Sequence, residues 1–292
     1  MAPSRDELKA AARETLDTVM VKLNHLRSSA QACSSDKYSS RTLPYLDPNA
    51  CPSHPEPATI KVINEDTLNA AIQLINEGGP DKPRPAILNF ANYRTPGGGW
   101  QNNGALAQEE ALCYRSSLAL SLNPRHYPLA MDEVLYSPYV LVVRGDILSG
   151  HLLLEDPPEA LPVVSALTVA ALYKPRVKTF LLKPPKSADT HMVEEDAAGS
   201  GAEQPLREKH IFELDRDRGI AKAKMRLALR MAAVNRHDLL NPPEDVAHCW
   251  LEVLREHEFS GNWWRQIWFA VYDPKEEGNY EIFDRVLSGK QV

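Results

Sequence analysis

The sequence has 292 residues, of which 43% are hydrophobic and 25% are charged, and its formal net charge is -6 at pH 7. These values are ordinary for a globular chain, so disorder throughout is excluded, and the length suits one large domain or two small ones. The net negative charge argues against a protein that binds nucleic acid over much of its surface, because phosphate binding requires a basic surface. No apolar run reaches the ~18 residues of a membrane span, and the N-terminus lacks the apolar stretch of a secretory signal. We therefore expect neither a membrane partner nor direct sequence-specific binding to nucleic acid.

The four cysteines, Cys33, Cys51, Cys113 and Cys249, show no CxxC spacing. So few cysteines in a chain of this length do not form a disulfide framework. An intracellular, reducing compartment, cytoplasmic and/or nuclear, is therefore expected. A disulfide between Cys33 and Cys51, which lie in a Pro- and Ser-rich stretch, is the minor alternative.

The first part of the chain is expected to hold one helix and an irregular connector. Hydrophobic residues recur at helical spacing over residues 5–29, with charges between them. Residues 30–58 are rich in Ser, Pro and Asn, which favours irregular structure. A predicted strand at 59–63 is followed by a helix with Asn64 or Asp66 as its N-cap.

From residue 85 onward, predicted strands and helices alternate, which is the pattern of an α/β layered domain. Short apolar runs predict strands at 85–90, 138–144, 161–167, 177–182 and 266–272. Helical spacing predicts helices at 106–122, 219–236, 242–257 and 279–288. Residues 184–218 interrupt the pattern with an acidic, small-residue-rich stretch and are expected to form a disordered surface insertion. A regulatory acidic loop is the alternative.

The most informative segment joins the predicted strand PAILNF to the helix that follows it. Three glycines at 97–99 lie between them, and the triplet Gln-Glu-Glu at 108–110 enters the helix. Consecutive glycines leave backbone N–H groups uncovered and allow the chain to wrap closely around a phosphate or a sugar. The helix start adds its dipole, and this end of a strand is where α/β sheets usually bind ligands. A flexible connection without a ligand explains the glycines equally well.

Two adjacent carboxylates, Glu109 and Glu110, suit the hydrolysis of a glycosidic bond. One acid can protonate the leaving oxygen and then activate water, while the other holds sugar hydroxyls. The alternative is structural, because acids in the first turn of a helix are stabilised by ~0.3–1 kcal/mol through the helix dipole. The residues by themselves leave both explanations open.

The run NFANYRTPGGGWQNNGALAQEEALCYRSSL resembles the signature of microbial-type poly(ADP-ribose) glycohydrolases, a branch of the macrodomain superfamily in which a GGG triplet shortly precedes QEE. Residues 61–71, 137–146 and 267–273 resemble other strands and helices of that family. The resemblance implies an α/β fold, namely a macrodomain-like three-layer α/β/α sandwich with a mixed central sheet. It would occupy residues 59–292, after an N-terminal helix and irregular connector over residues 1–58.

The same resemblance implies a role for each residue of the segment. Glu110 matches the catalytic acid/base, which protonates the leaving oxygen and then deprotonates the attacking water. Glu109 matches the acid that positions the distal ribose hydroxyls, Gln108 supports the loop, and Asn92 contacts the distal ribose. The loop that closes over the distal ribose and phosphate is matched by Gly97, Gly98 and Gly99. The mechanism requires no metal and no cofactor.

Three further residues are expected on the adenine side of the substrate. Tyr272 follows the last predicted strand, where macrodomains often stack an aromatic ring on adenine, and a packed or rim tyrosine is the alternative. Asp66 and Thr67 are expected to line the same side, with helix capping as the favoured alternative for them.

The sequence departs from the family between Asn235 and Glu244. Family members carry a strand and a second glycine-rich loop there, which wraps the diphosphate, and the loop and most of its strand are missing here. The lost N–H donors are expected to weaken diphosphate binding, since each hydrogen bond to a charged group contributes ~1.5–3 kcal/mol. A gap in the central sheet is also expected.

The resemblance implies a glycohydrolase that cleaves ribose–ribose or ribose–protein O-glycosidic bonds and releases ADP-ribose. Its partner would be ADP-ribose or poly(ADP-ribose) on modified proteins. The intact QEE favours the enzyme, whereas the missing loop favours a catalytically weak or inactive ADP-ribose-binding macrodomain. An inactive, misfolding chain is a third alternative.

Two late features are interpreted as structural. Aromatic residues near a final strand usually pack in the core or at its rim, as expected of Trp250, Trp263, Trp264 and Trp268. A basic helix side is usually a solvated face, as expected of Arg226, Arg230 and Arg236.

Overall fold

The computed structural model describes residues 3–78, 84–170, 172, 175–182, 207–235, 239–240, 245–276 and 278–292. Within these ranges the helices are α1 (Arg5–Asn24), α2 (Ser29–Ala32), α3 (Thr67–Glu77), α4 (Gln108–Arg115), α5 (Leu118–Ser121), α6 (Asp215–Val234), α7 (Asp245–Leu254) and α8 (Asn279–Leu287). The strands are β1 (Asp36–Ser39), β2 (Ile60–Ile63), β3 (Ala86–Ala91), β4 (Glu133–Leu141), β5 (Val163–Ala170), β6 (Val177–Leu182), β7 (Arg207–Phe212), β8 (Leu239–Leu240) and β9 (Ile267–Ala270). None of the helices in these ranges has the length and apolar character that crossing a bilayer demands.

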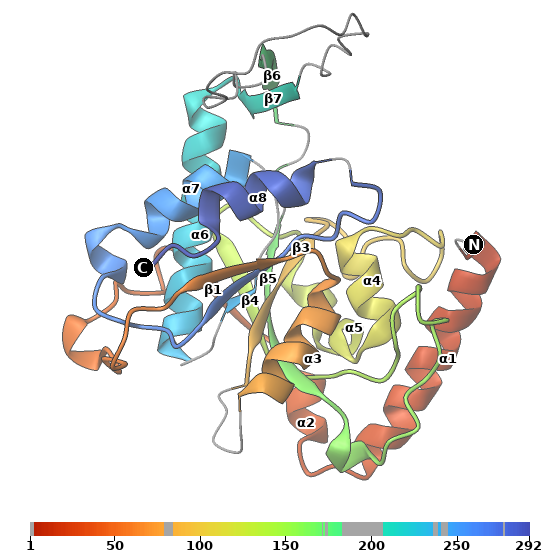
Figure 1. Ribbon diagram of the computed structural model, residues 1–292. Coiled ribbons are helices and arrows are strands. Elements are labelled where there is room, and N and C mark those ends of the chain that lie inside the picture. The colour runs from red at the N-terminus through yellow and green to blue at the C-terminus, as the bar shows by residue number, and fades with distance from the viewer. Residues whose placement is uncertain are drawn as a thin grey trace, which may run out of the picture.

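Seven strands form one mixed sheet in the order β1-β4-β5-β3-β8-β9-β2. The pairs β5–β3, β3–β8, β8–β9 and β9–β2 are parallel, whereas β1–β4 and β4–β5 are antiparallel. The sheet lies in the middle of the molecule, with α6, α7 and α8 on one face and α3, α4 and α5 on the other (Figure 1). The predicted three-layer α/β/α sandwich is therefore confirmed.

Apolar side chains of β3 point alternately to the two faces of the sheet, which explains why helices cover both faces. Successive side chains of a strand point to opposite faces, so Leu88 packs in the cluster with α6, α7 and α8, and Ile87 packs in the cluster with α3 and α4. The late tryptophans belong to these two clusters, and the expectation that they pack in the core is confirmed for Trp250, Trp263, Trp264 and Trp268.

The N-terminal region is more ordered than its composition predicts. A capping box between Ser4 and Glu7 begins α1, which buries Leu8, Val19 and Leu23 and ends at Asn24, earlier than expected. The expected irregular connector contains α2 and the edge strand β1, which pairs antiparallel with β4. The pairing that makes β1 a strand comes from residues almost a hundred positions away, so the local sequence carries little sign of it.

Two further elements differ from the sequence prediction because of distant contacts. The expected helix at 106–122 is interrupted at Ser116, which takes an extended backbone and forms a bridge with Val142. The basic side of α6 is not simply a solvated face, because Arg226 forms an ion pair with Glu256 at 2.6 Å. Arg230, which is 7% exposed, pairs with Glu258 at the same distance. Arg236 lies outside the described residues.

The expected gap in the sheet is not found. Leu239 and Leu240 form β8, which pairs in parallel with β3 on one side and β9 on the other. This strand is only two residues long, so the sheet is continuous but narrow at this point. The missing loop falls on residues 236–238 and 241–244, which lie outside the described residues.

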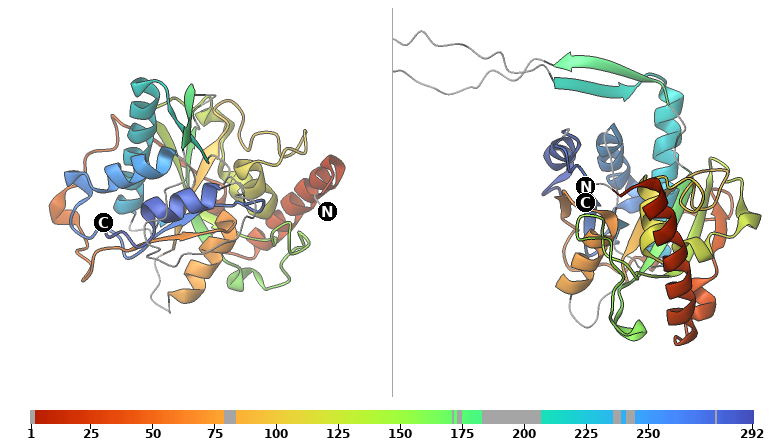
Figure 2. Two further views of the ribbon diagram at one scale, coloured as in Figure 1. Left: turned by 45° about the horizontal axis from the view of Figure 1, so that its top comes forward. Right: turned by 90° about the vertical axis from the view of Figure 1, so that its right-hand side faces the viewer.

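The expected disordered insertion, residues 184–218, is in part a regular structure. Its last third contains β7 and the first turn of α6, and β7 pairs antiparallel with β6 to form a separate two-stranded sheet. Figure 2 shows this hairpin projecting from the body beyond the start of α6. Residues 183–206, which include the acidic stretch, lie outside the described residues.

Candidate active site

The two adjacent acids lie where β3 ends and α4 begins. The helix begins at Gln108, so Glu109 and Glu110 occupy its first turn. They are nevertheless only 3% and 8% exposed. Their burial argues against a solvated helix start, because a charge is buried only at a cost in free energy that its hydrogen-bond partners must offset.

Glu109 is held by three donors at the mouth of the glycine loop. Its Oε2 accepts a hydrogen bond from the backbone N–H of Asn92 at 2.8 Å, and its Oε1 accepts from the N–H of Gly97 at 3.1 Å and from Nδ2 of Asn89 at 3.4 Å. Burial nonetheless raises the pKa of Glu109 to about 7, with the charge of Glu110 adding to the effect and the three hydrogen bonds opposing it. This acid therefore titrates near neutral pH.

Glu110 is held by one backbone donor on each oxygen. Its Oε1 accepts from the N–H of Gly99 at 2.9 Å, and its Oε2 accepts from the N–H of Ala107 at 3.2 Å. A carboxylate has about four lone-pair sites, so both oxygens keep acceptor capacity for a substrate or a water molecule. The backbone thus fixes the orientation of Glu110 without saturating it.

The three glycines bind the protein's own groups rather than leaving their N–H groups uncovered, which corrects the sequence expectation. Gly97 donates to Glu109, Gly99 donates to Glu110, and Gly98 donates to the carbonyl of Thr95 at 3.0 Å. Gly97 and Gly98 have φ angles of +69° and +59°, which explains the need for glycine at these two positions. Successive N–H groups in such a turn favour an anion, and here the two carboxylates provide it.

Gln108 completes the edge of β3 beyond the end of β8. Its Oε1 accepts from the N–H of Phe90 at 2.8 Å, and its Nε2 donates to the carbonyl of Leu88 at 2.6 Å. β8 pairs only opposite Ala86 and Ile87, so within the described ranges these two backbone groups have no strand beside them. The Gln108 amide therefore binds the edge of β3, and its support of the glycine loop stays a prediction.

Asn92 and Tyr272 lie at the two ends of the region expected to bind the substrate. Oδ1 of Asn92 accepts from the N–H groups of Arg94 and Thr95, which closes a turn at the exposed end of β3. Tyr272, after β9, is 52% exposed, so it is not a core residue. Burial raises the pKa of Tyr272, and the negative charge of Asp66 adds to the effect.

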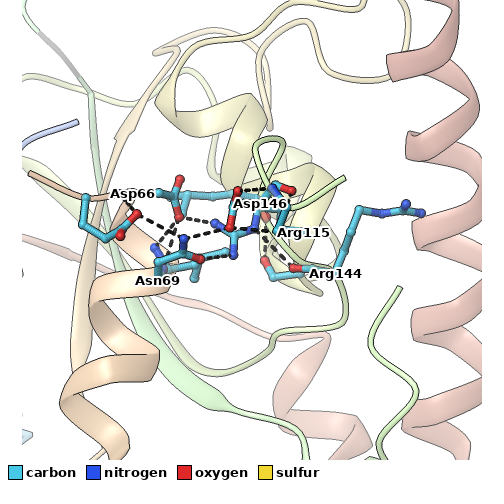
Figure 3. A network of polar contacts seen from close by, with 10 residues as sticks. Asp66, Asn69, Arg115, Arg144 and Asp146 are labelled. Atoms are coloured by element: carbon cyan, nitrogen blue, oxygen red, sulfur yellow. Dashed lines mark hydrogen bonds and ion pairs between the residues drawn. The ribbon is translucent and has the colours of Figure 1, made fainter. Parts of the chain in front are cut away.

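Asp66 is a helix cap and also part of a partly buried polar network (Figure 3). Its Oδ1 accepts from the N–H groups of Leu68 at 2.9 Å and Asn69 at 3.2 Å, so the capping interpretation is confirmed for Asp66. The same carboxylate forms an ion pair with Arg115, at the end of α4. Thr67, the first residue of α3, is 7% exposed.

Arg115 was not marked by any sequence pattern, yet it joins the helix of the acids to α3. Its Nη2 donates to Oδ1 of Asn69 at 2.7 Å, and its Nε donates to the carbonyl of Arg144 at 3.2 Å. Asn69 in turn donates to Asp146 at 2.9 Å. Burial acts to raise the pKa of Asp146, but the hydrogen bonds from Asn69 and Ser149 outweigh it and hold the pKa at about 2. Figure 3 shows these side chains converging between α3 and α4.

The fold and the buried pair of acids define a macrodomain-like α/β domain with a carboxylate site at the C-terminal end of its sheet. Residues 12–145, which contain the glycine loop and both acids, match the family model "Microbial-type PARG, catalytic domain", where PARG denotes poly(ADP-ribose) glycohydrolase. The part of the chain that carries the site is thus similar to the catalytic domain of the microbial-type PARG family. This match supports an enzyme of the glycohydrolase class.

Solved structures share the fold of this chain. Poly(ADP-ribose) glycohydrolase from Thermomonospora curvata is 23% identical, with a TM-score of 0.68 over 96% of this chain and 99% of that chain. The enzyme from Deinococcus radiodurans, in complex with ADP-ribose, is 23% identical, with a TM-score of 0.61 over 89% of this chain and 97% of that chain. A search of the curated proteins finds no match to this chain.

Proposed function

We propose that this glycohydrolase cleaves ribose–ribose or ribose–protein O-glycosidic bonds of (poly)ADP-ribose on modified proteins and releases ADP-ribose. The observation that carries the proposal is the arrangement of the two acids, which are buried, adjacent and separately held by the backbone of the glycine loop and its flanks. Solvent-exposed acids would not be oriented in this way. The ADP-ribose complex of the relative from Deinococcus radiodurans supports the substrate class.

Glu110 acts as the acid and then as the base in this proposal. Its proton passes to the leaving oxygen as the bond from that oxygen to the anomeric carbon breaks. The carboxylate then accepts a proton from a water molecule, whose oxygen bonds to the anomeric carbon, so the starting protonation state is restored. The free acceptor capacity of both Glu110 oxygens supports this role.

The remaining residues hold the substrate. Glu109 and Asn92 bind the distal ribose, and Gly97, Gly98 and Gly99 close over it through the loop that also orients the acids. Tyr272, with Asp66 and Thr67, lies on the adenine side, supported by the exposure of the tyrosine ring. Residues 59–292 form the hydrolytic domain in this proposal, residues 1–58 its N-terminal extension, and the location of the protein is intracellular.

A direct test measures release of free ADP-ribose from ADP-ribosylated protein. Glu110→Gln is expected to abolish release, while Glu281→Gln, an exposed acid in the first turn of α8, serves as the matched control and retains it. Equal turnover by wild type and Glu110→Gln would overturn the assigned role.

The alternative function is binding of ADP-ribose without turnover, which the missing second glycine-rich loop favours. Calorimetry with ADP-ribose separates the two. Binding by a wild-type protein that releases no ADP-ribose would support the binding module, whereas turnover that depends on Glu110 supports the enzyme.

A further inference from the structure

An apolar cavity lies on the face of the sheet opposite the two acids. It has a volume of about 300 Å³ and lies between the C-terminal ends of β3 and β5, helices α6 and α7, and the end of β7. Its deeper wall includes Leu88, Val169 and Ala228, which are almost fully buried. Half-buried Phe90 and Phe212 lie at its rim. The cavity is therefore enclosed on the sheet side and accessible at the rim.

One charged side chain stands among the described residues that line this apolar cavity. Lys224, on α6, is 7% exposed, and its Nζ has no hydrogen-bond partner among the described residues. The indole N–H of Trp250, another lining residue, is also buried without a partner. Both unsatisfied groups are donors, and an unpaired buried donor costs free energy that an acceptor would recover. The cavity thus offers hydrogen-bond donors and an apolar wall, and none of its described lining residues has a side chain with an oxygen acceptor.

Neighbouring cations of the same helix are paired within the chain. Lys222 forms an ion pair with Glu252 at 3.1 Å, and Arg226 pairs with Glu256 at 2.6 Å. Lys224 points instead toward the sheet, where burial lowers its pKa to about 8 and the charge of Asp132 only partly opposes the shift. At neutral pH the side chain is still largely protonated, and no carboxylate among the described residues neutralises it by direct contact.

We propose that this cavity binds an amphipathic carboxylate, such as a medium-chain fatty acid, with its carboxylate on Lys224 and its alkyl chain against the apolar wall. The charge of the ligand would satisfy the one buried ammonium of the cavity, and the alkyl chain would fill the apolar volume. The site is distinct from the one that holds Glu109 and Glu110, because Phe90 faces the cavity while its neighbour Asn89 faces Glu109.

Isothermal titration calorimetry of the full chain with decanoate, decanol and decylamine tests the proposal. Decanoate is expected to bind wild type at least ~10-fold more tightly than decanol, as a charge-assisted hydrogen bond predicts, and decylamine is expected not to bind. Lys224→Met keeps the length of the side chain and removes its charge, so it should reduce affinity for decanoate at least ~10-fold and leave that for decanol unchanged. Lys222→Met is the matched control and should bind decanoate as wild type does.

Three results would overturn the proposal. The first is that Lys224→Met binds decanoate as tightly as wild type does, and the second is that decanol binds as tightly as decanoate. The third is that ADP-ribose displaces decanoate, which would make the cavity part of the substrate site. If Lys224→Met does not fold, the number of protons that the wild-type protein takes up on binding decanoate tests the proposal instead. At pH 8 decanoate should bind with a net uptake of protons, because a bound carboxylate favours the charged form of Lys224, whose pKa burial lowers. Release of protons on binding contradicts the assignment.

Discussion

A Cβ atom placed on Gly98 would lie 2.3 Å from Oε1 of Glu110, well inside van der Waals contact. The glycine therefore sets the position of the proposed catalytic carboxylate by allowing the loop backbone to lie directly against it. Glycine is required at position 98 for two reasons, the close approach to Glu110 and the positive φ. A matched pair of substitutions distinguishes their effects.

Gly98→Ala is expected to lower the rate of ADP-ribose release at least ~10²-fold, because a small displacement of a catalytic group has a cost of that size. Gly289→Ala is the control, since Gly289 also has a positive φ of +72° but nothing within 4 Å of the added Cβ. Both variants should lose ~1–2 kcal/mol of stability from the backbone conformation. Equal rates for the two variants would show that contact with Glu110 is not what requires Gly98.

Glu109→Gln is expected to change how stability depends on pH. The pKa of Glu109 is raised from 4.5 to about 7 in the folded protein, so the unfolded chain releases this proton first as pH rises. The contribution of Glu109 to stability therefore falls between these two pH values, by up to ~3 kcal/mol. Denaturant unfolding at pH 5 and pH 8 should show the variant gaining stability relative to wild type at the higher pH. A difference that stays constant with pH would contradict the raised pKa.

Gln108→Ala is expected to destabilise the protein by ~1–3 kcal/mol, because it leaves the N–H of Phe90 and the carbonyl of Leu88 without their shared partner. Gln73→Ala, on the exposed face of α3, is the control and should cost ~0.5 kcal/mol or less. The measurement is urea unfolding of both variants. Similar losses would mean that another group occupies the edge of β3.

Arg115→Lys is expected to cost ~3 kcal/mol, since a lysine cannot reproduce the fork that joins Asp66, Asn69 and the Arg144 carbonyl. Arg218→Lys is the control, because its ion pair with Glu252 is largely exposed and should contribute less than ~1 kcal/mol. Thermal unfolding compares the two. If Arg115→Lys loses no more stability than the control does, the network around Arg115 does not join α3 to α4.

Features with a local cause could be predicted from the sequence. The cap at Asp66, the apolar strand β3 and the helix α8 are each determined by residues within a few positions of one another. The adjacent acids at the entry to α4 were identified for the same reason.

Features that depend on distant pairing could not be predicted. β1 is a strand because β4 lies beside it, and α4 stops at Arg115 because the next residue joins the end of β4. The use of the glycine N–H groups was also missed. Glycines predict a backbone that can bind an anion, but only the fold shows that the side chains of Glu109 and Glu110 return to fill that position.

Because β8 is short, the sheet has fewer backbone hydrogen bonds between β3 and β9 than between β4 and β5. Strands β9 and β2 are connected to β3 through two residues, Leu239 and Leu240, whereas β4 and β5 share a ladder along most of their length. Opening that narrow junction breaks fewer ladder hydrogen bonds than opening the β4–β5 pair does. We therefore expect the amide hydrogens of β2 and β9 to exchange through a local opening that costs less free energy than the opening of β5.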